Sequence, residues 1–135
     1  MIVVERIAPD GTTHRITIRA HELLADMGPA DGGGDEGPDP HDLYDAALGA
    51  CKALTMVWYA KRKGIALEGV RVGIARDASE ERDGVYKLTA RIAVDGPMTA
   101  DEREALIGVA GKCPVHKLMT QVETRIETLP VEPRD

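Results

Sequence analysis

Apolar residues are concentrated in one long run, and both ends of this run carry signals for the ends of a helix. Asp39 is a favourable N-cap, Pro40 suits the first helical position, and Gly64 supplies a left-handed stop. The pattern predicts a central helix over residues 40–63, apolar on most of its sides and hence buried. One stripe at helical spacing is expected to face the core: Tyr44, Ala47, Leu48, Cys51, Leu54, Thr55 and Trp58.

Alternating apolar and polar residues upstream of this helix predict strands. Within residues 1–20, the runs IVVERIA and HRITIR flank the turn signal Pro-Asp-Gly-Thr, which indicates an N-terminal β-hairpin. Residues 21–25 form either a further short strand or a bend. The Gly- and Pro-rich stretch at about residues 27–39 is expected to be a flexible loop.

A second hairpin and a second helix are predicted after the central helix. Residues 70–74 and 86–94 alternate at strand period, so one face of this hairpin should pack on the helix and its charged face should meet water. Thr99 and Glu102 have the spacing of a capping box, which predicts the start of a helix. Its buried stripe is expected to contain Ala105, Leu106, Val109 and Ala110.

The sequence pattern of the C-terminal part predicts a short third helix and a last strand. Cys113-Pro114 is typical of a helix start, residues 122–129 alternate as a strand does, and residues 130–135 are expected to form a frayed tail. The order is hairpin, long helix, hairpin, helix, short helix and strand. Because the strands are grouped instead of alternating with helices, the expected class is α+β, with residues 1–135 in a single domain.

Composition and charge narrow the classes of partner. The net charge is -6 and no basic patch offsets it, which argues against a nucleic-acid-binding protein. No run reaches the roughly 18 apolar residues of a membrane span. The N-terminal residues lack the long apolar segment of a secretory signal. These features predict a cytoplasmic protein without a nucleic-acid or membrane partner.

The two cysteines, Cys51 and Cys113, are the candidate reactive groups. A structural disulfide is not expected in the cytoplasm, so they are either a reactive pair or unrelated core thiols. Cys113 lies at a predicted helix start, where N–H groups and the dipole favour a thiolate that Lys112 and His116 could assist. Burial of Cys51 disfavours its thiolate, and the adjacent Lys52 points roughly 100° away around the helix. A partner that activates Cys51 must therefore come from elsewhere in the fold.

Two other kinds of site use the same residue types. A zinc site could be built from four residues that lack the close paired spacing of zinc ligands: Cys51, Cys113, His41 and His116. A Cys–His hydrolase could use His116 or His41 as its base, although no oxyanion-hole signature accompanies them. Neither pattern is favoured, and no metal or other cofactor is predicted.

Two motifs resemble those of a known superfamily. Residues 39–51, DPHDLYDAALGAC, resemble the helix motif P-x-x-L-x-x-A-x-x-x-x-C of the OsmC/Ohr superfamily, and residues 112–116, KCPVH, resemble its second-cysteine motif. The motifs occur in the expected order, with a predicted hairpin and helix between them. The resemblance covers roughly residues 23–129 and is closest to the general OsmC-like branch.

This resemblance implies an OsmC-like fold, an intertwined homodimer and a mechanism. The long helices would pack at the centre of the dimer, with sheets around them and the active sites at the interface. By analogy with the peroxidase members, Cys51 attacks a hydroperoxide as the peroxidatic thiolate, and Cys113 resolves the resulting sulfenic acid as a disulfide. An external dithiol then reduces the disulfide. The implied function is a thiol-dependent organic hydroperoxide reductase in oxidative-stress defence.

The sequence departs from the peroxidase pattern at the start of the central helix. Peroxidase members carry a Glu about ten residues before the first cysteine, paired with an Arg from the N-terminal region, whereas His41 and Asp42 stand here. Arg15 and Arg19, followed by His21, are the nearest candidates for the Arg. We expect Asp42 to orient an Arg, or a protonated His41 to assist the cysteine.

A non-catalytic member of the same superfamily is the alternative. Such a protein would bind an apolar small molecule in the interface pocket, or would sense redox state through the cysteine pair. Both alternatives imply the same fold and homodimer. They differ in whether Cys51 turns over a hydroperoxide with a thiol reductant.

Overall fold

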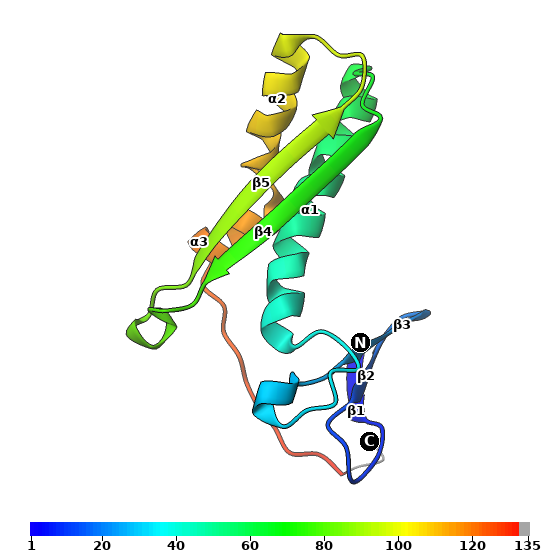
Figure 1. Cartoon of the computed structure of the whole chain (residues 1–135), viewed down its shortest axis with the longest axis vertical. Helices are drawn as coiled ribbons and strands as arrows, with labels where there is room; N and C mark the ends of the chain where they lie inside the picture. Colours follow the sequence, from blue (N-terminus) through cyan, green and yellow to red (C-terminus); the bar gives the residue numbers. More distant parts are fainter. Residues whose placement is uncertain (133–135) are drawn as a thin grey trace.

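The computed structural model of the protein describes residues 1–132, and its longest element is the helix α1 (Pro40–Lys63), which runs through the middle of the molecule (Figure 1). The side chains of Asp39 and Asp42 each accept a hydrogen bond from the N–H of the other residue, which closes a capping box. Gly64 ends the helix in the left-handed region, with a φ of 65°. The predicted bounds of the central helix are confirmed.

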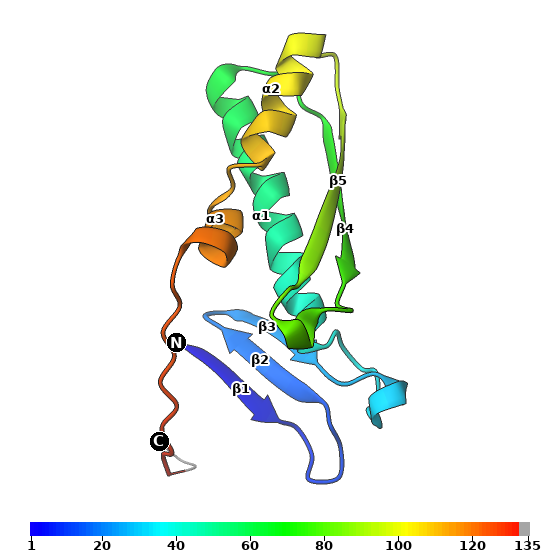
Figure 2. The same ribbon diagram turned by 90° about the vertical axis from the view of Figure 1, so that its left-hand side faces the viewer.

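Three antiparallel strands form a first sheet, in the order β1 (Ile2–Arg6), β2 (His14–Ile18) and β3 (His21–Ala25). In the middle strand, Ile16 lies opposite Val4 on one side and Leu23 on the other. The predicted N-terminal hairpin is confirmed, and residues 21–25 form a strand, not a bend. This sheet lies beyond the N-terminal end of α1, apart from the helices (Figures 1 and 2), and most of its residues are exposed.

The segment between β3 and α1 is tied to the first hairpin by one carboxylate. The Asp26 side chain belongs to a residue that is only 3% exposed, and it accepts four hydrogen bonds, from the hydroxyls of Thr12 and Thr13 and the N–H groups of Met27 and Glu36. The Thr12 hydroxyl, followed by the other donors, holds the pKa of this carboxyl well below its usual value against the opposing effect of burial. The predicted flexible loop is thus joined to the sheet near both of its ends, at Met27 and at Glu36.

The rest of the chain forms a second hairpin and two helices: β4 (Gly69–Asp77), β5 (Lys87–Asp95), α2 (Ala100–Ala110) and α3 (Pro114–Gln121). Two single turns of 3-10 helix lie in the connections, η1 (Pro29–Asp31) and η2 (Glu81–Asp83). In the second hairpin, Val72 lies opposite Ile92. This hairpin and both helices confirm the predictions, including the Thr99 capping box of α2. Within residues 1–132, no helix combines the length and the apolar content that a membrane crossing requires.

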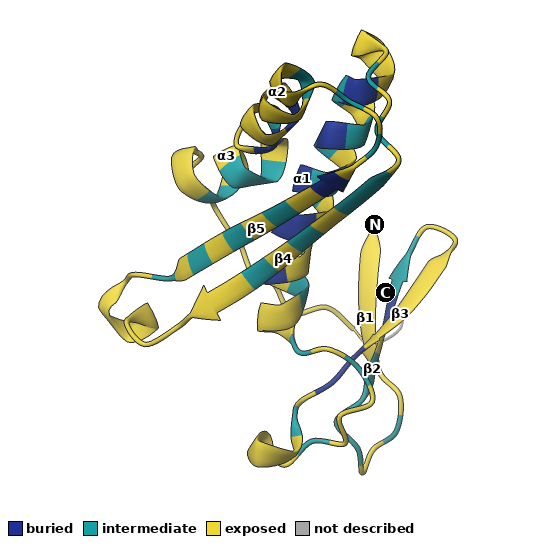
Figure 3. Ribbon diagram, turned by 45° about the horizontal axis from the view of Figure 1, so that its top comes forward, coloured by how far each residue is buried: buried dark blue, intermediate teal, exposed yellow. Residues whose placement is uncertain are grey.

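The core lies where α1, β5 and α2 meet (Figure 3), and its buried residues are Met56, Ala60, Val94, Leu106 and Ala110. The hairpin covers one side of α1, with its alternating apolar residues half-buried against the helix. Close packing depends on Gly49, because a Cβ added there would lie 3.2 Å from Ile74 Cγ1. The predicted apolar face of the hairpin is confirmed.

The buried side of α1 differs from the predicted stripe, which was wrong for most of its members. The buried residues are Asp45, Leu48, Gly49, Lys52, Met56 and Ala60. Of the predicted stripe, Leu48 is buried, whereas Leu54 is 68% and Trp58 is 56% exposed. The helix is apolar on both sides, and the hairpin covers the side on which Gly49 permits close approach. The side that carries Cys51 therefore faces outward in the single chain.

The predicted last strand is absent from the described residues. Residues 122–129 follow α3 as an exposed, irregular segment that runs past the first sheet (Figure 1). An alternating sequence forms a strand only when a neighbouring strand pairs with its backbone, and neither sheet includes this segment. Of the predicted tail, residues 130–132 have no regular structure and residues 133–135 lie outside the described residues.

Candidate functional site

Cys51 lies half-buried in the middle of α1, and its Sγ accepts a hydrogen bond from the first turn of α3. The donor is the N–H of Val115, whose nitrogen is 3.4 Å from Sγ. Cys113 is the N-cap of α3 and Pro114 follows it, but the Cys113 side chain makes no capping hydrogen bond. Cys51 therefore takes the place of a capping side chain. The first turn of α3 thus directs a backbone N–H donor at the Cys51 sulfur.

Cys113 is completely buried at the same junction between α1 and α3. Pro114 alone separates it from Val115, whose N–H meets Cys51. Both cysteines are free thiols. The packing of α3 on α1 thus brings the two candidate reactive residues, which are far apart in sequence, to one place.

A cavity of about 660 Å³ opens beside Cys51 on the outward side of α1. Its other lining residues are mostly apolar: Ala47, Ala50, Leu54, Thr55, Trp58, Val109, Lys112 and Pro114. An apolar wall beside a thiol suits a ligand with an alkyl or aryl group better than a small, strongly hydrated one. The ammonium group of Lys112 adds a positive charge to this wall.

Lys52 follows Cys51 in sequence and is buried beneath α2 and α3. The residue is 4% exposed, and its Nζ donates hydrogen bonds to the Ala110 carbonyl and to His116 Nδ1, each at 3.0 Å. Ala110 is the last residue of α2, so the ammonium lies at the negative end of that helix. Because His116 Nδ1 accepts this bond, the ring proton is assigned to Nε2.

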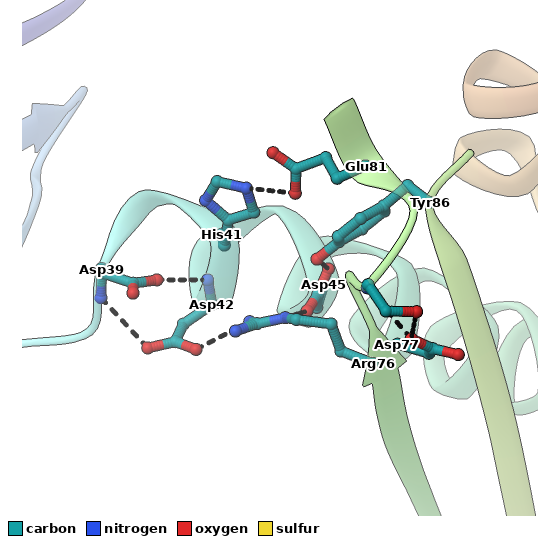
Figure 4. Close-up of polar contacts among 9 residues, drawn as sticks. Asp39, His41, Asp42, Asp45, Arg76, Asp77, Glu81 and Tyr86 are labelled. Atoms are coloured by element: carbon teal, nitrogen blue, oxygen red, sulfur yellow. Dashed lines mark hydrogen bonds and ion pairs between the residues drawn. The ribbon is translucent and has the colours of Figure 1, made fainter. Parts of the chain in front are cut away.

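A second polar cluster surrounds Arg76 of β4 near the start of α1 (Figure 4). The guanidinium donates to Asp42 at 2.8 Å and to Asp45, and the Tyr86 hydroxyl donates to Asp45 at 2.7 Å. The hydrogen bond from Arg76 lowers the pKa of Asp42. The hydrogen bond to Asp42, followed by the one to Asp45, raises the pKa of Arg76. Burial, followed by the bond to Asp45, raises the pKa of Tyr86 to about 12. The cavity lined by this cluster does not include Cys51.

The candidate assisting side chains near the N-terminus make no polar contact with Cys51 within the described residues. His41 Nε2 lies 2.8 Å from Glu81 Oε1, at the start of α1. Arg15 has its own ion pair within the first sheet. Arg19 lies in the turn between β2 and β3, with a φ of 55°. Among the described residues of the single chain, the polar contact of Cys51 Sγ is the Val115 N–H.

Two charged residues that organise these sites were not predicted from the sequence. Arg76 follows Ile74 at strand period, which places it on the face of β4 that meets α1, and Asp42 orients this Arg instead of one near the N-terminus. Lys52 precedes Met56 by one helical turn on the buried side of α1. In both cases, the sequence could have indicated the site, because a charged residue stands where the strand or helix pattern calls for an apolar one.

The residues of the zinc alternative do not converge on one point. His41 is bonded to Glu81, whereas Cys51 and Cys113 lie at the junction of α1 and α3. In the part of the chain that the structure describes, no three His, Cys, Asp or Glu side chains are grouped as metal ligands would be.

Solved structures with the same fold come from several bacteria. An OsmC-like protein from Mycoplasma pneumoniae has a TM-score of 0.72 and 19% identity, over 90% of this chain and 87% of that chain. An organic hydroperoxide resistance protein OsmC from Legionella pneumophila has a TM-score of 0.60 and 21% identity, over 90% of both chains. The organic hydroperoxide resistance protein OhrB of Bacillus subtilis has a TM-score of 0.58 and 21% identity, over 90% of this chain and 91% of that chain.

These likenesses establish the fold, since the identities are low. No curated protein sequence gives a significant match. The sequence model described as OsmC-like protein matches residues 32–128, which include both cysteines and all of α1. The chain belongs to the OsmC-like protein family.

Proposed function

We propose that this protein is a thiol-dependent peroxidase that reduces organic hydroperoxides in oxidative-stress defence. Cys51 is its peroxidatic residue and Cys113 its resolving residue. The hydrogen bond from the Val115 N–H to Cys51 Sγ carries this proposal, because it places the half-buried sulfur at a helix N-terminus, a setting in which reactive cysteines commonly occur. Membership of the OsmC-like family supports it, as do two structural neighbours named as organic hydroperoxide resistance proteins.

The proposed reaction has three steps. The Cys51 thiolate attacks the terminal oxygen of the hydroperoxide, the O–O bond breaks, and the alkoxide takes a proton and leaves as an alcohol. Cys51 is then a sulfenic acid, and Cys113 sulfur attacks Cys51 sulfur with release of water to form a disulfide. An external dithiol reduces this disulfide by thiol–disulfide exchange, which returns two free thiols and leaves the reductant oxidised.

The cavity beside Cys51 supports an organic substrate. Its walls come mainly from alanine, leucine and tryptophan side chains, which can cover the alkyl or aryl group of a hydroperoxide. A molecule of hydrogen peroxide has no apolar part to bury there. We therefore assign the cavity to the organic group, with the peroxide oxygens directed toward the sulfur.

We expect the resolving step to involve a local movement. Cys113 is completely buried, and a disulfide needs Cα atoms about 4.4–6.8 Å apart with suitable Cβ directions. Because Pro114 alone separates Cys113 from Val115, a shift of the first turn of α3 would move the resolving thiol and the activating N–H together. The hydrogen bond from the Val115 N–H to Cys51 Sγ would then break.

The proposed enzyme is a homodimer. On the outward side of α1, Leu54 and Trp58 are 68% and 56% exposed, and on β1 Ile2 and Val4 are 62% and 57% exposed. Apolar surfaces of this kind are normally covered by a partner. A second copy would cover the outward side of α1 and enclose the cavity beside Cys51.

Redox sensing or binding without turnover is the second candidate function. It is favoured by Arg76, which is held by Asp42 and Asp45 and lines a cavity that excludes Cys51. Without an Arg at the sulfur, a single oxidation event could serve as a signal without rapid turnover. Steady-state kinetics separates the two functions.

The test measures consumption of cumene hydroperoxide and tert-butyl hydroperoxide by the reduced protein with a dithiol reductant. If the protein is a peroxidase, we expect each chain to reduce many molecules of hydroperoxide, and Cys51→Ser should abolish this turnover. Cys113→Ser should still consume about one equivalent of hydroperoxide in the absence of reductant, because only the resolving step is lost. A wild-type rate no faster than that of free cysteine would reject the peroxidase proposal and leave the sensor.

A further inference from the structure

We propose that Lys52 is a positioning residue, which holds the first turn of α3 so that the Val115 N–H is directed at Cys51 Sγ. This inference rests on the proposed role of Cys51 as the reactive thiol. The Lys52 side chain is buried, its hydrogen bonds go to partners other than the sulfur, and it does not line the cavity beside Cys51.

The contacts of Lys52 span one short segment of the chain. Its Nζ is bonded to the carbonyl of Ala110, the last residue of α2, and to Nδ1 of His116, the third residue of α3. Residues 111–115 lie between these two points and contain both Cys113 and the Val115 donor. One ammonium group therefore fixes both ends of the segment that presents the N–H to Cys51.

The chemistry of the position argues for this role over simple packing. A buried ammonium is costly unless its protons are hydrogen-bonded, and the residue is 4% exposed. One helical turn further along the same side of α1, the fully buried Met56 satisfies the packing without a charge. An apolar residue at position 52 could fill the space, but it could not join the end of α2 to the start of α3.

Apart from the burial of Cys113, the first turn of α3 has few other restraints. Pro114 has no N–H, and the Cys113 side chain makes no capping bond. The hydrogen bond from the Lys117 N–H to the Cys113 carbonyl, at 3.3 Å, lies within α3 and does not orient it relative to α1. The His116 contact of Lys52 ties this turn to α1, one residue beyond the Val115 donor.

The test measures alkylation of Cys51 by iodoacetamide as a function of pH, with each cysteine quantified by peptide mass spectrometry in the full-length chain. Lys52→Met removes the ammonium at similar volume. His116→Leu removes the acceptor but leaves the charge of Lys52, whereas His116→Asn keeps an acceptor near the place of Nδ1. Lys61→Met, in the exposed last turn of α1, is the matched control for loss of one positive charge.

We expect Lys52→Met and His116→Leu to slow alkylation at pH 7 about tenfold, since a hydrogen bond to a charged group typically has this effect. The alkylation midpoint should rise by about one pH unit. His116→Asn and Lys61→Met should stay within about twofold of the wild-type rate. Hydrogen exchange of the Val115 amide should accelerate in Lys52→Met and His116→Leu only, because in these variants the Val115 N–H would lose its hydrogen bond to Cys51 Sγ.

Wild-type alkylation in Lys52→Met would overturn the proposal. Slow alkylation in Lys52→Met with a wild-type profile in His116→Leu would also overturn it, because the charge of Lys52 would then act without positioning α3. If Lys52→Met fails to fold, the comparison of His116→Leu with His116→Asn decides. The assay uses no peroxide, so a protein that alkylates as expected but does not turn over hydroperoxide would refute the proposed function alone.

Discussion

Arg76 joins two elements through a small set of acidic and phenolic groups near the start of α1 (Figure 4). Asp42 completes the capping box of α1 and also binds the guanidinium, while Asp45 receives hydrogen bonds from both Arg76 and Tyr86. Each acceptor is matched to a donor, which is what buried polar groups require. This cluster joins β4 to α1, and the Cys51 thiol makes a separate contact, with the Val115 N–H.

The Tyr86 phenol should ionise at about pH 12, because burial and the bond to Asp45 disfavour the phenolate. Its folded-state pKa exceeds the unfolded value of about 10, so its contribution to stability is present below pH 10 and fades as the pH rises toward 12. The difference between the tyrosinate absorbance titrations of wild type and Tyr86→Phe should have its midpoint near 12. A difference curve centred near the ordinary value of about 10 would contradict the assignment.

Asp26 should make the stability of the protein sensitive to acid. Its carboxyl has a pKa well below the unfolded value, so the stability it adds is present above about pH 4 and is lost as the pH falls toward the folded-state pKa. Asp26→Asn should lower Tm at neutral pH and flatten the fall of Tm below about pH 4. Exposed Asp10→Asn, in the turn of the first hairpin, is the control. Equal acid sensitivity of Asp26→Asn and wild type would be inconsistent with this role.

At the scale of elements, α1 has two faces that the fold uses differently. One face packs on the second hairpin and α2, and the other carries Cys51 and the apolar cavity. Gly49 sets the distance between α1 and β4, because an added side chain would meet Ile74. The arrangement of the first face therefore determines how α2 and α3 approach the thiol.

Gly49→Val should destabilise the protein by about 1–3 kcal/mol, because a branched side chain overpacks the contact with Ile74. Gly108→Val is the matched control, since no atom lies within 4 Å of a Cβ added at this helical position. It should be neutral or slightly stabilising, by less than about 1 kcal/mol. Urea unfolding of both variants measures the difference. Equal stabilities would mean that the helix and strand can separate without cost.

Local signals in the sequence located the helices and both hairpins, but they did not show what each element packs against or pairs with. Asp39 and Gly64 mark the ends of α1 because caps and left-handed stops are local chemistry. The buried face of α1 could not be predicted, because both faces are apolar and the choice depends on what packs there. The prediction of the last strand was wrong for a related reason, since no strand pairs with residues 122–129. The Val115 contact was also unpredictable, because it joins residues of two helices distant in sequence.

At the scale of the whole molecule, the exposed apolar side of α1 and the exposed first sheet are the features that a single chain leaves unexplained. Trp58 is the only tryptophan, and it lies in the wall of the cavity beside Cys51. A homodimer would cover this residue and reduce the access of water to the thiol. The quaternary state is therefore part of the proposed chemistry.

Light scattering after size-exclusion chromatography should give twice the mass of one chain. Leu54→Glu introduces a charge on the outward side of α1 and should yield monomers, with a red shift of the Trp58 emission as the indole meets water. Val85→Glu, in the connection between β4 and β5, is the matched control and should remain dimeric. A monomeric wild-type protein would contradict the proposed homodimer.

Mass spectrometry of the reduced wild-type protein after one equivalent of cumene hydroperoxide, without reductant, tests whether Cys51 is the peroxidatic residue and Cys113 the resolving one. We predict rapid formation of a disulfide between Cys51 and Cys113, and a Cys51 sulfenic acid that dimedone traps in Cys113→Ser. Oxidation that begins at Cys113, or a Cys51 thiol that stays reduced on the timescale of free cysteine, would contradict it.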